Sequence, residues 1–135
     1  MTNWNDSLLI GVELIDKEHR KLIDAIDKLM DACNHGKDRD EIGHTLHFIN
    51  NYAREHIKVE ENLQEKYAYP GISAHKRLHA QFAMSLSSLV HEFDETGPNV
   101  TMTAKFNKTL VEWGIHHIAV EDKKVGEHVR NSGAK

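Results

Sequence analysis

The sequence predicts an all-α protein, an up-down-up-down antiparallel four-helix bundle with an N-terminal arm. Apolar residues recur at steps of three and four along four long segments, which is the spacing of one helix face. Only three short segments interrupt this spacing, and each contains glycine: residues 35–38 and the segments around Pro70 and Pro98. Short connections make neighbouring helices antiparallel, so the four helices should alternate in direction. A chain of 135 residues fits a single domain, 1–135.

Residues 1–14 precede the first clear helical pattern and are expected to form an arm that packs along the bundle. The first helix is predicted over about residues 15–34. Its apolar stripe alternates steps of four and three and consists of Ile15, His19, Leu22, Ile26, Leu29 and Cys33. Because His19 lies within this stripe, its imidazole is expected to face the interior of the bundle.

The second helix is predicted over about residues 40–66, with Asp38 as its N-terminal cap. Its buried face includes His56 and Glu60, which lie one helical turn apart. An unpaired ionised carboxylate inside a core is very costly, so Glu60 needs a cation or a strong hydrogen-bonding partner. The neighbouring Glu61 falls off this face and is expected to be solvated.

The third helix is predicted over about residues 73–95 and the fourth over about residues 101–128. The third begins with His75 and His79, again one turn apart and on the core side. The fourth carries His117 on its apolar stripe, near its end. With alternating directions, all of these histidines fall at the same end of the bundle as the carboxylate of the second helix.

Histidine is unusually frequent in this chain, with 11 residues, and five of them are expected to face inward in one layer. Histidine is the commonest metal ligand in proteins, and imidazole together with carboxylate suits iron. Five imidazoles exceed what one tetrahedral zinc ion binds, so the layer predicts two metal ions. A carboxylate from the last helix would complete the site, and Glu121 and Asp122 follow His117 at four and five residues. Regular helical spacing favours Glu121.

These motifs resemble those of the hemerythrin family, most closely the single-domain bacterial hemerythrins. The likeness runs through the stretches "DKEH", "HIKVE", "HKRLH" and "WGIHHIAVED". The family's last motif is a histidine followed five residues later by aspartate, so the resemblance selects Asp122 over Glu121. It implies a ligand set of His19, His56, Glu60, His75, His79, His117 and Asp122.

The resemblance also implies a cofactor of two non-haem iron ions, bridged by Glu60, Asp122 and a solvent-derived oxygen. His75, His79 and His117 would complete one iron. His19 and His56 would hold the other iron and leave one position open for dioxygen. The five-residue step from the histidine to the aspartate turns about 140° away from a regular helix face. We therefore predict a local distortion there, such as a π-bulge.

Four bulky apolar residues match the family's dioxygen pocket: Leu22, Ile57, Trp113 and Ile118. Such a pocket keeps water away from the open iron. The first function hypothesis is therefore reversible dioxygen binding for storage or delivery, by a protein without catalytic residues. The alternatives are a di-iron redox enzyme acting on peroxide or nitric oxide, served by an electron donor, and an oxygen or redox sensor that works through a separate partner. A purely structural bundle would bind no metal.

The charge distribution argues against a nucleic-acid partner. Net charge is −4, acidic and basic residues are interspersed along the helical segments, and no basic stripe is present to bind phosphates. No basic leader precedes an apolar run, and no apolar stretch approaches the roughly 20 residues that a membrane span needs. We therefore expect no membrane association and a cytoplasmic location.

Overall fold

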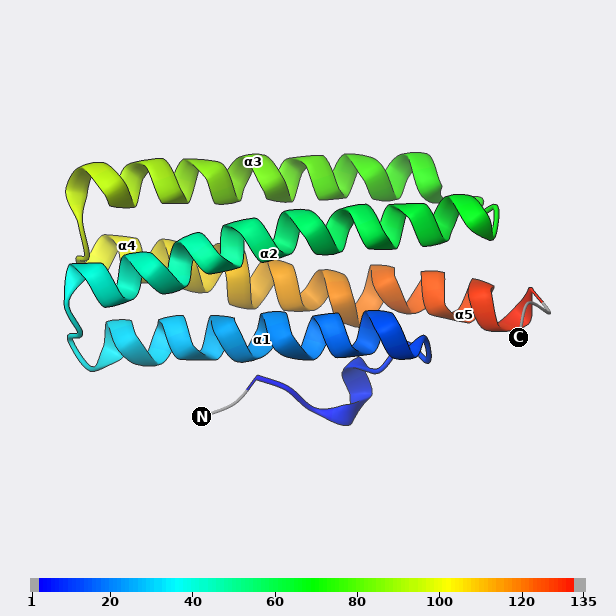
Figure 1. Ribbon diagram of the computed structural model, residues 1–135, viewed down its shortest axis with the longest axis horizontal. Coiled ribbons are helices and arrows are strands. Elements are labelled where there is room, and N and C mark those ends of the chain that lie inside the picture. The colour runs from blue at the N-terminus through cyan, green and yellow to red at the C-terminus, as the bar shows by residue number, and fades with distance from the viewer. Residues whose placement is uncertain (1–2, 133–135) are drawn as a thin grey trace.

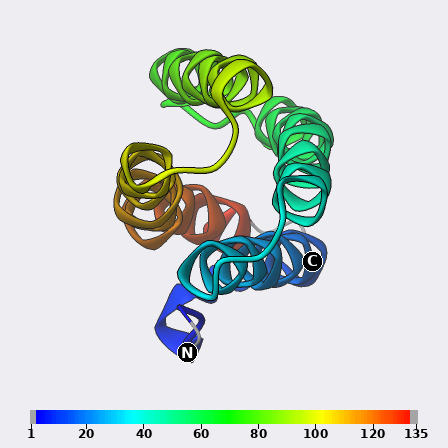
Figure 2. The same cartoon turned by 90° about the vertical axis from the view of Figure 1, so that its left-hand side faces the viewer.

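The computed structural model describes residues 3–132 and confirms the all-α bundle. The chain forms four helical arms, which run alternately up and down (Figure 1), and an end-on view shows them side by side around a common axis (Figure 2). The first three arms are single helices, α1 (Glu13–Asn34), α2 (Arg39–Lys66) and α3 (Ile72–Thr96). The fourth arm consists of α4 (Val100–Phe106), the π-helical segments η2 (Asn107–Ile115) and η3 (Ile118–Asp122), and α5 (Lys123–Asn131).

The helix bounds differ from the predicted ones mainly at the two ends of the chain. Helix α1 begins at Glu13 instead of residue 15, and α5 continues to Asn131 instead of ending at residue 128. Two helices inside the chain begin at a residue whose side chain caps the helix N-terminus. Asp38 accepts a hydrogen bond of 2.8 Å from the Glu41 backbone N–H before α2, and Asn99 caps α4 in the same way.

The N-terminal arm is shorter than the predicted 1–14, because α1 already begins at Glu13. Residues 1 and 2 lie outside the described part of the chain. The N-terminal arm contains a short 3₁₀ turn, η1 (Asp6–Leu8), and Ile10 is buried against the bundle. Arg130 of α5 donates a hydrogen bond of 2.8 Å to the Ile10 carbonyl oxygen. This hydrogen bond connects the N-terminal segment, just before α1, with the end of the fourth helical arm, next to the histidine layer.

The half of the bundle away from the histidines is an apolar core. Its buried members come from all four arms and include Leu29, Ile42, Leu46, Leu89, Phe93 and Phe106. This packed end fixes how the arms are rotated about their axes, and the rotation decides which side chains meet at the other end. Among residues 3–132, none of the helices has both the length and the hydropathy needed to cross a membrane.

Candidate metal centre

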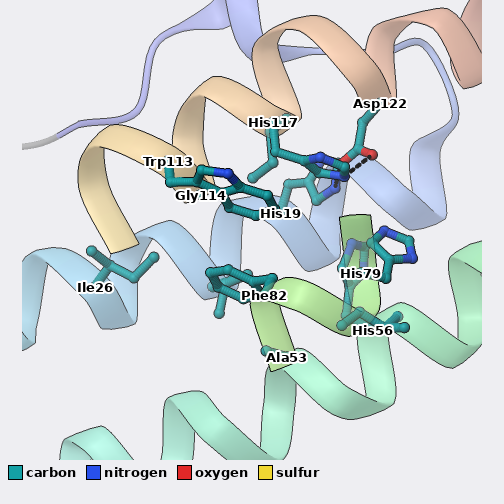
Figure 3. Close-up of a pocket in the computed structure, with 13 residues that line it drawn as sticks. His19, Ile26, Ala53, His56, His79, Phe82, Trp113, Gly114, His117 and Asp122 are labelled. Carbon is teal, nitrogen blue, oxygen red and sulfur yellow. Dashed lines mark ion pairs between the residues drawn. The ribbon is translucent and has the colours of Figure 1, made fainter. Parts of the chain in front are cut away.

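All seven predicted ligand side chains are buried and meet at one end of the bundle. Figure 3 shows this convergence for His19, His56, His79, His117 and Asp122, which come from all four arms. The potential ligand atoms form two groups, and within each group they lie within 4.8 Å of one another. One group comprises Glu60, His75, His79, His117 and Asp122, and the other comprises His19, His56, Glu60 and Asp122. The two groups therefore share both carboxylates.

Glu60 turns each of its carboxylate oxygens toward a different pair of imidazoles. Its Oε1 lies 2.8 Å from His75 Nε2 and 3.4 Å from His79 Nε2. Its Oε2 lies 3.1 Å from His56 Nε2 and 3.5 Å from His19 Nε2. A carboxylate placed in this way can bind one cation through each oxygen.

Asp122 repeats this division from the opposite side of the site. Its Oδ1 lies 2.9 Å from His75 Nε2 and 3.1 Å from His117 Nε2. Its Oδ2 lies 3.0 Å from His19 Nε2. The division of the imidazoles is the one that the family resemblance implies, with three on one side and two on the other.

The hydrogen-bonding state of these atoms shows that the site fits metal ions. Within residues 3–132, Glu60 Oε2, Asp122 Oδ1 and His19 Nε2 are fully buried and make no hydrogen bond. Leaving such an atom unsatisfied costs about 1–3 kcal/mol, more when it is charged. Cations between the carboxylates and imidazoles would satisfy all three atoms at once. The donor set of imidazole nitrogens and carboxylate oxygens also suits iron.

Without a metal, the carboxylates and imidazoles of the site stabilise one another's charged forms. Burial lowers the pKa of His19, but the adjacent Asp122 and Glu60 carboxylates outweigh it and raise the pKa to about 9. The same causes raise the pKa of His75 to about 9. Burial raises the pKa of Glu60, but the four surrounding histidines hold it well below its usual range. The metal-free site therefore holds imidazolium and carboxylate charges together at neutral pH.

These shifts predict how the stability of the metal-free protein depends on pH. Raised histidine pKa values contribute stability that is complete below the ordinary value of 6.5 and is lost as pH rises toward about 9. The lowered Glu60 pKa contributes stability that is present above its ordinary value of 4.5 and is lost in acid. We expect the thermal unfolding temperature of chelator-treated protein to decrease as the pH is raised from 6.5 to 9. A Zn²⁺-loaded control should lose this dependence, and a flat profile without metal would contradict the charge assignment.

The last ligand reaches the site because the fourth arm is not a regular α-helix. The distortion predicted between His117 and Asp122 is confirmed, since η3 (Ile118–Asp122) is π-helical. A π-helix pairs residues five apart, which returns the aspartate to the face of the histidine. Glu121, which regular spacing favoured, is instead at the surface and pairs with Lys124. The longer π-helical segment η2 was not predicted.

A small cavity adjoins the imidazoles, and all four predicted pocket residues line it. Its volume is about 40 Å³, and its apolar wall also includes Ile26, Ala53, Phe82 and Gly114, which sequence reasoning did not assign to it. Trp113 stacks between Phe82 and His117, with ring centroids 5.2 and 5.3 Å away and nearly parallel planes. Ile26 lies one turn after Leu22, so extending the predicted pocket by one turn would have found it.

Three polar residues around the ligands were missed. Glu18 and Glu61 are hydrogen-bonded to ligand imidazoles, and the buried Gln64 Nε2 donates to Glu60 Oε1 at 3.4 Å. The expectation that Glu61 is solvated is wrong, because its side chain is only 24% exposed and faces α3. Glu18 and Glu61 lie at the flanks of the predicted stripes, whereas Gln64 lies one turn after Glu60 on the buried face itself, at a step of four where the prediction took the step of three to Leu63.

Comparisons with known proteins agree with this arrangement. The family model for the hemerythrin HHE cation binding domain matches residues 10–129. The bacteriohemerythrin of Pseudomonas aeruginosa strain LESB58 is 30% identical over 129 residues, which cover 96% of this chain and 82% of that protein. The myohemerythrin of Theromyzon tessulatum is 25% identical, with 90% and 88% covered. The crystal structure of a wild-type hemerythrin superposes with a TM-score of 0.83 at 26% identity, with 96% and 98% covered.

Proposed function

The chain belongs to the hemerythrin family, and from this premise we propose that it binds dioxygen reversibly at a non-haem di-iron centre, for storage or delivery. One observation carries the proposal. Two groups of buried ligand atoms share two carboxylates beside a small apolar cavity. The residues thus provide for two adjacent cations and for a small ligand next to them.

The proposed ligand roles follow the two groups. His75, His79 and His117 would hold one iron, His19 and His56 would hold the other, and both carboxylates would bridge them. The second iron would then have one protein ligand fewer than the first, so an external molecule could bind there. When bound, the iron pair supplies two electrons to dioxygen and recovers them on release.

The cavity supports dioxygen as the ligand. It borders His19 and His56, and also His79 and His117 of the other ligand group. Among its apolar walls, Leu22 lies one helical turn after His19, and Ile57 follows His56 directly. A space of about 40 Å³ exceeds the roughly 10–15 Å³ that a single bound water needs by the same measure, so it admits a molecule as small as dioxygen. The apolar wall disfavours water, which would promote irreversible oxidation.

The charge of the ligand set favours reversible binding over oxygenation of a substrate. Two carboxylates and neutral imidazoles leave two ferrous ions with a net positive charge. Carboxylate-rich di-iron bundles supply more negative ligands, and these stabilise higher oxidation states. A histidine-rich set stabilises them less, so dioxygen should be released unchanged.

A di-iron redox enzyme acting on peroxide or nitric oxide is the second candidate. The Phe82 and Trp113 rings border both the inner cavity and a hollow of about 450 Å³ at the surface. The hollow also has polar walls, including Lys108 and Glu112. Because both rings line both spaces, the hollow and the inner cavity lie on either side of this stacked pair, and a small polar molecule in the hollow would be close to the cavity wall.

Dioxygen consumption in an oxygen electrode separates the two candidates. We expect the reduced, iron-loaded protein to take up one dioxygen molecule per chain and then stop, even with reductant in excess. Metal-free protein is the control and should take up none. Continued consumption of dioxygen or peroxide with reductant would contradict the carrier function and favour the enzyme.

A further inference from the structure

Two of the five inward histidines are hydrogen-bonded to a carboxylate through their outer ring nitrogen. His56 Nδ1 lies 2.7 Å from Glu18 Oε1, and His79 Nδ1 lies 2.8 Å from Glu61 Oε2. Both contacts cross between helices, from α2 to α1 in the first case and from α3 to α2 in the second. Each carboxylate therefore acts on an imidazole that belongs to a neighbouring arm.

The opposite nitrogen of each of these rings faces the metal site. His56 Nε2 lies 3.1 Å from Glu60 Oε2, and His79 Nε2 lies 3.4 Å from Glu60 Oε1. Each imidazole thus contacts an outer carboxylate through Nδ1 and the carboxylate of Glu60 through Nε2. A neutral imidazole in this setting donates its Nδ1 proton outward and presents the Nε2 lone pair inward.

The other three inward histidines lack such a partner. Within residues 3–132, the carboxylates paired with His19, His75 and His117 are those of the site itself and face Nε2. The Nδ1 of His19 is buried without any hydrogen bond. The two outer carboxylates are therefore a specific feature of two positions, not a general property of the histidine layer.

The two carboxylate-bound histidines are divided between the two ligand groups. His56 belongs to the group with His19, and His79 belongs to the group with three imidazoles. We propose that Glu18 and Glu61 are positioning residues, one for each metal ion, which hold these imidazoles in the Nε2-binding form and strengthen them as donors. This inference rests on the proposed di-metal centre and adds a role for two residues outside it.

The physical reason is that a carboxylate accepting the Nδ1 proton fixes the tautomer and the ring orientation and raises the basicity of the other nitrogen. The side chains of Glu18 and Glu61 are 19% and 24% exposed, so each remains partly hydrated and its charge costs little to maintain. Each also adds one negative charge close to one metal position.

Co²⁺ is a suitable probe, because it reports binding without dioxygen chemistry. We would measure Co²⁺ affinity by competition with a chelator and record proton NMR spectra of the loaded protein. The wild type should bind two Co²⁺ ions, and the N–H signals of His56 and His79 should exchange slowly with solvent. Glu18→Ala and Glu61→Ala should each lose one of these signals and bind Co²⁺ about 10–100-fold more weakly.

Two further sets of variants separate positioning from a purely structural role. Glu18→Gln and Glu61→Gln keep an acceptor oxygen, so the slow N–H signal should return and part of the affinity with it. Glu65→Ala is the matched control, because Glu65 also connects α2 with α3, through a 2.9 Å ion pair with Lys76, but contacts no ligand. It should leave both readouts unchanged.

Two outcomes would overturn the inference, and they are distinguishable. If the wild type binds two Co²⁺ ions and the alanine variants match it in affinity and N–H signals, the positioning role is wrong while the di-metal centre stands. If the wild type itself binds no Co²⁺ at the site, the proposed di-metal centre fails, and the positioning role fails with it.

Discussion

Glu60→Ala is expected to abolish iron binding at both positions, not at one. Each Glu60 oxygen faces a different pair of imidazoles, so its removal takes a ligand from both groups. The loss of affinity should exceed the roughly 10–100-fold that removal of an outer-sphere partner costs. The metal-free variant should also be less stable at neutral pH by about 3–5 kcal/mol, because buried imidazolium groups lose their counter-charge. Iron analysis and thermal unfolding measure the two effects.

The control for this variant is Glu55→Ala. Glu55 lies on the same helix but is exposed, and the ion pair that it forms within residues 3–132 is with the nearby Lys58. It should keep the wild-type iron content and stability. A Glu60→Ala protein that retains both irons would show that this carboxylate is not shared between two metals.

Leu22→Ser is expected to leave iron bound but to shorten the lifetime of the oxygenated protein. Leu22 is 6% exposed and lines the cavity beside His19 and His56 without supplying a ligand. A smaller hydroxyl side chain enlarges the cavity and gives water a hydrogen-bonding partner there. We expect autoxidation to accelerate by at least about tenfold, since about 1.4 kcal/mol of barrier corresponds to that factor. The decay of the visible spectrum in air measures it.

The matched control is Leu29→Ser, because Leu29 is fully buried on the same helix but belongs to the apolar end of the core. Both variants should lose stability, since deletion of a buried leucine side chain costs about 2–5 kcal/mol. Only the variant at the cavity should oxidise faster. Equal lifetimes for the two variants would remove the protective role assigned to the cavity wall.

The arrangement of the helices was predictable because it depends on local patterns. Apolar steps of three and four marked the inward faces, and Pro70, Pro98 and Gly36 marked the breaks. The inward position of Glu60 followed from the same stripe. With short connections, these patterns were enough to bring residues from four distant segments into one layer.

The features that were not predicted depend on departures from regular helix geometry and on contacts between side chains of neighbouring helices. Regular spacing pointed to Glu121, and only the family resemblance selected Asp122, because a π-helical turn is not visible in an apolar pattern. The partners of His56 and His79 were missed for another reason. Which flanking residue of one helix meets a ring of the next depends on how the helices rotate against each other.

Visible absorption of the reduced, iron-loaded protein through a cycle of air and vacuum tests the central claim most directly. The account predicts two irons per chain and a charge-transfer band that appears with dioxygen, disappears under vacuum and returns over repeated cycles. A stable ferric spectrum that vacuum does not reverse, or fewer than two irons per chain in fully loaded protein, would contradict it.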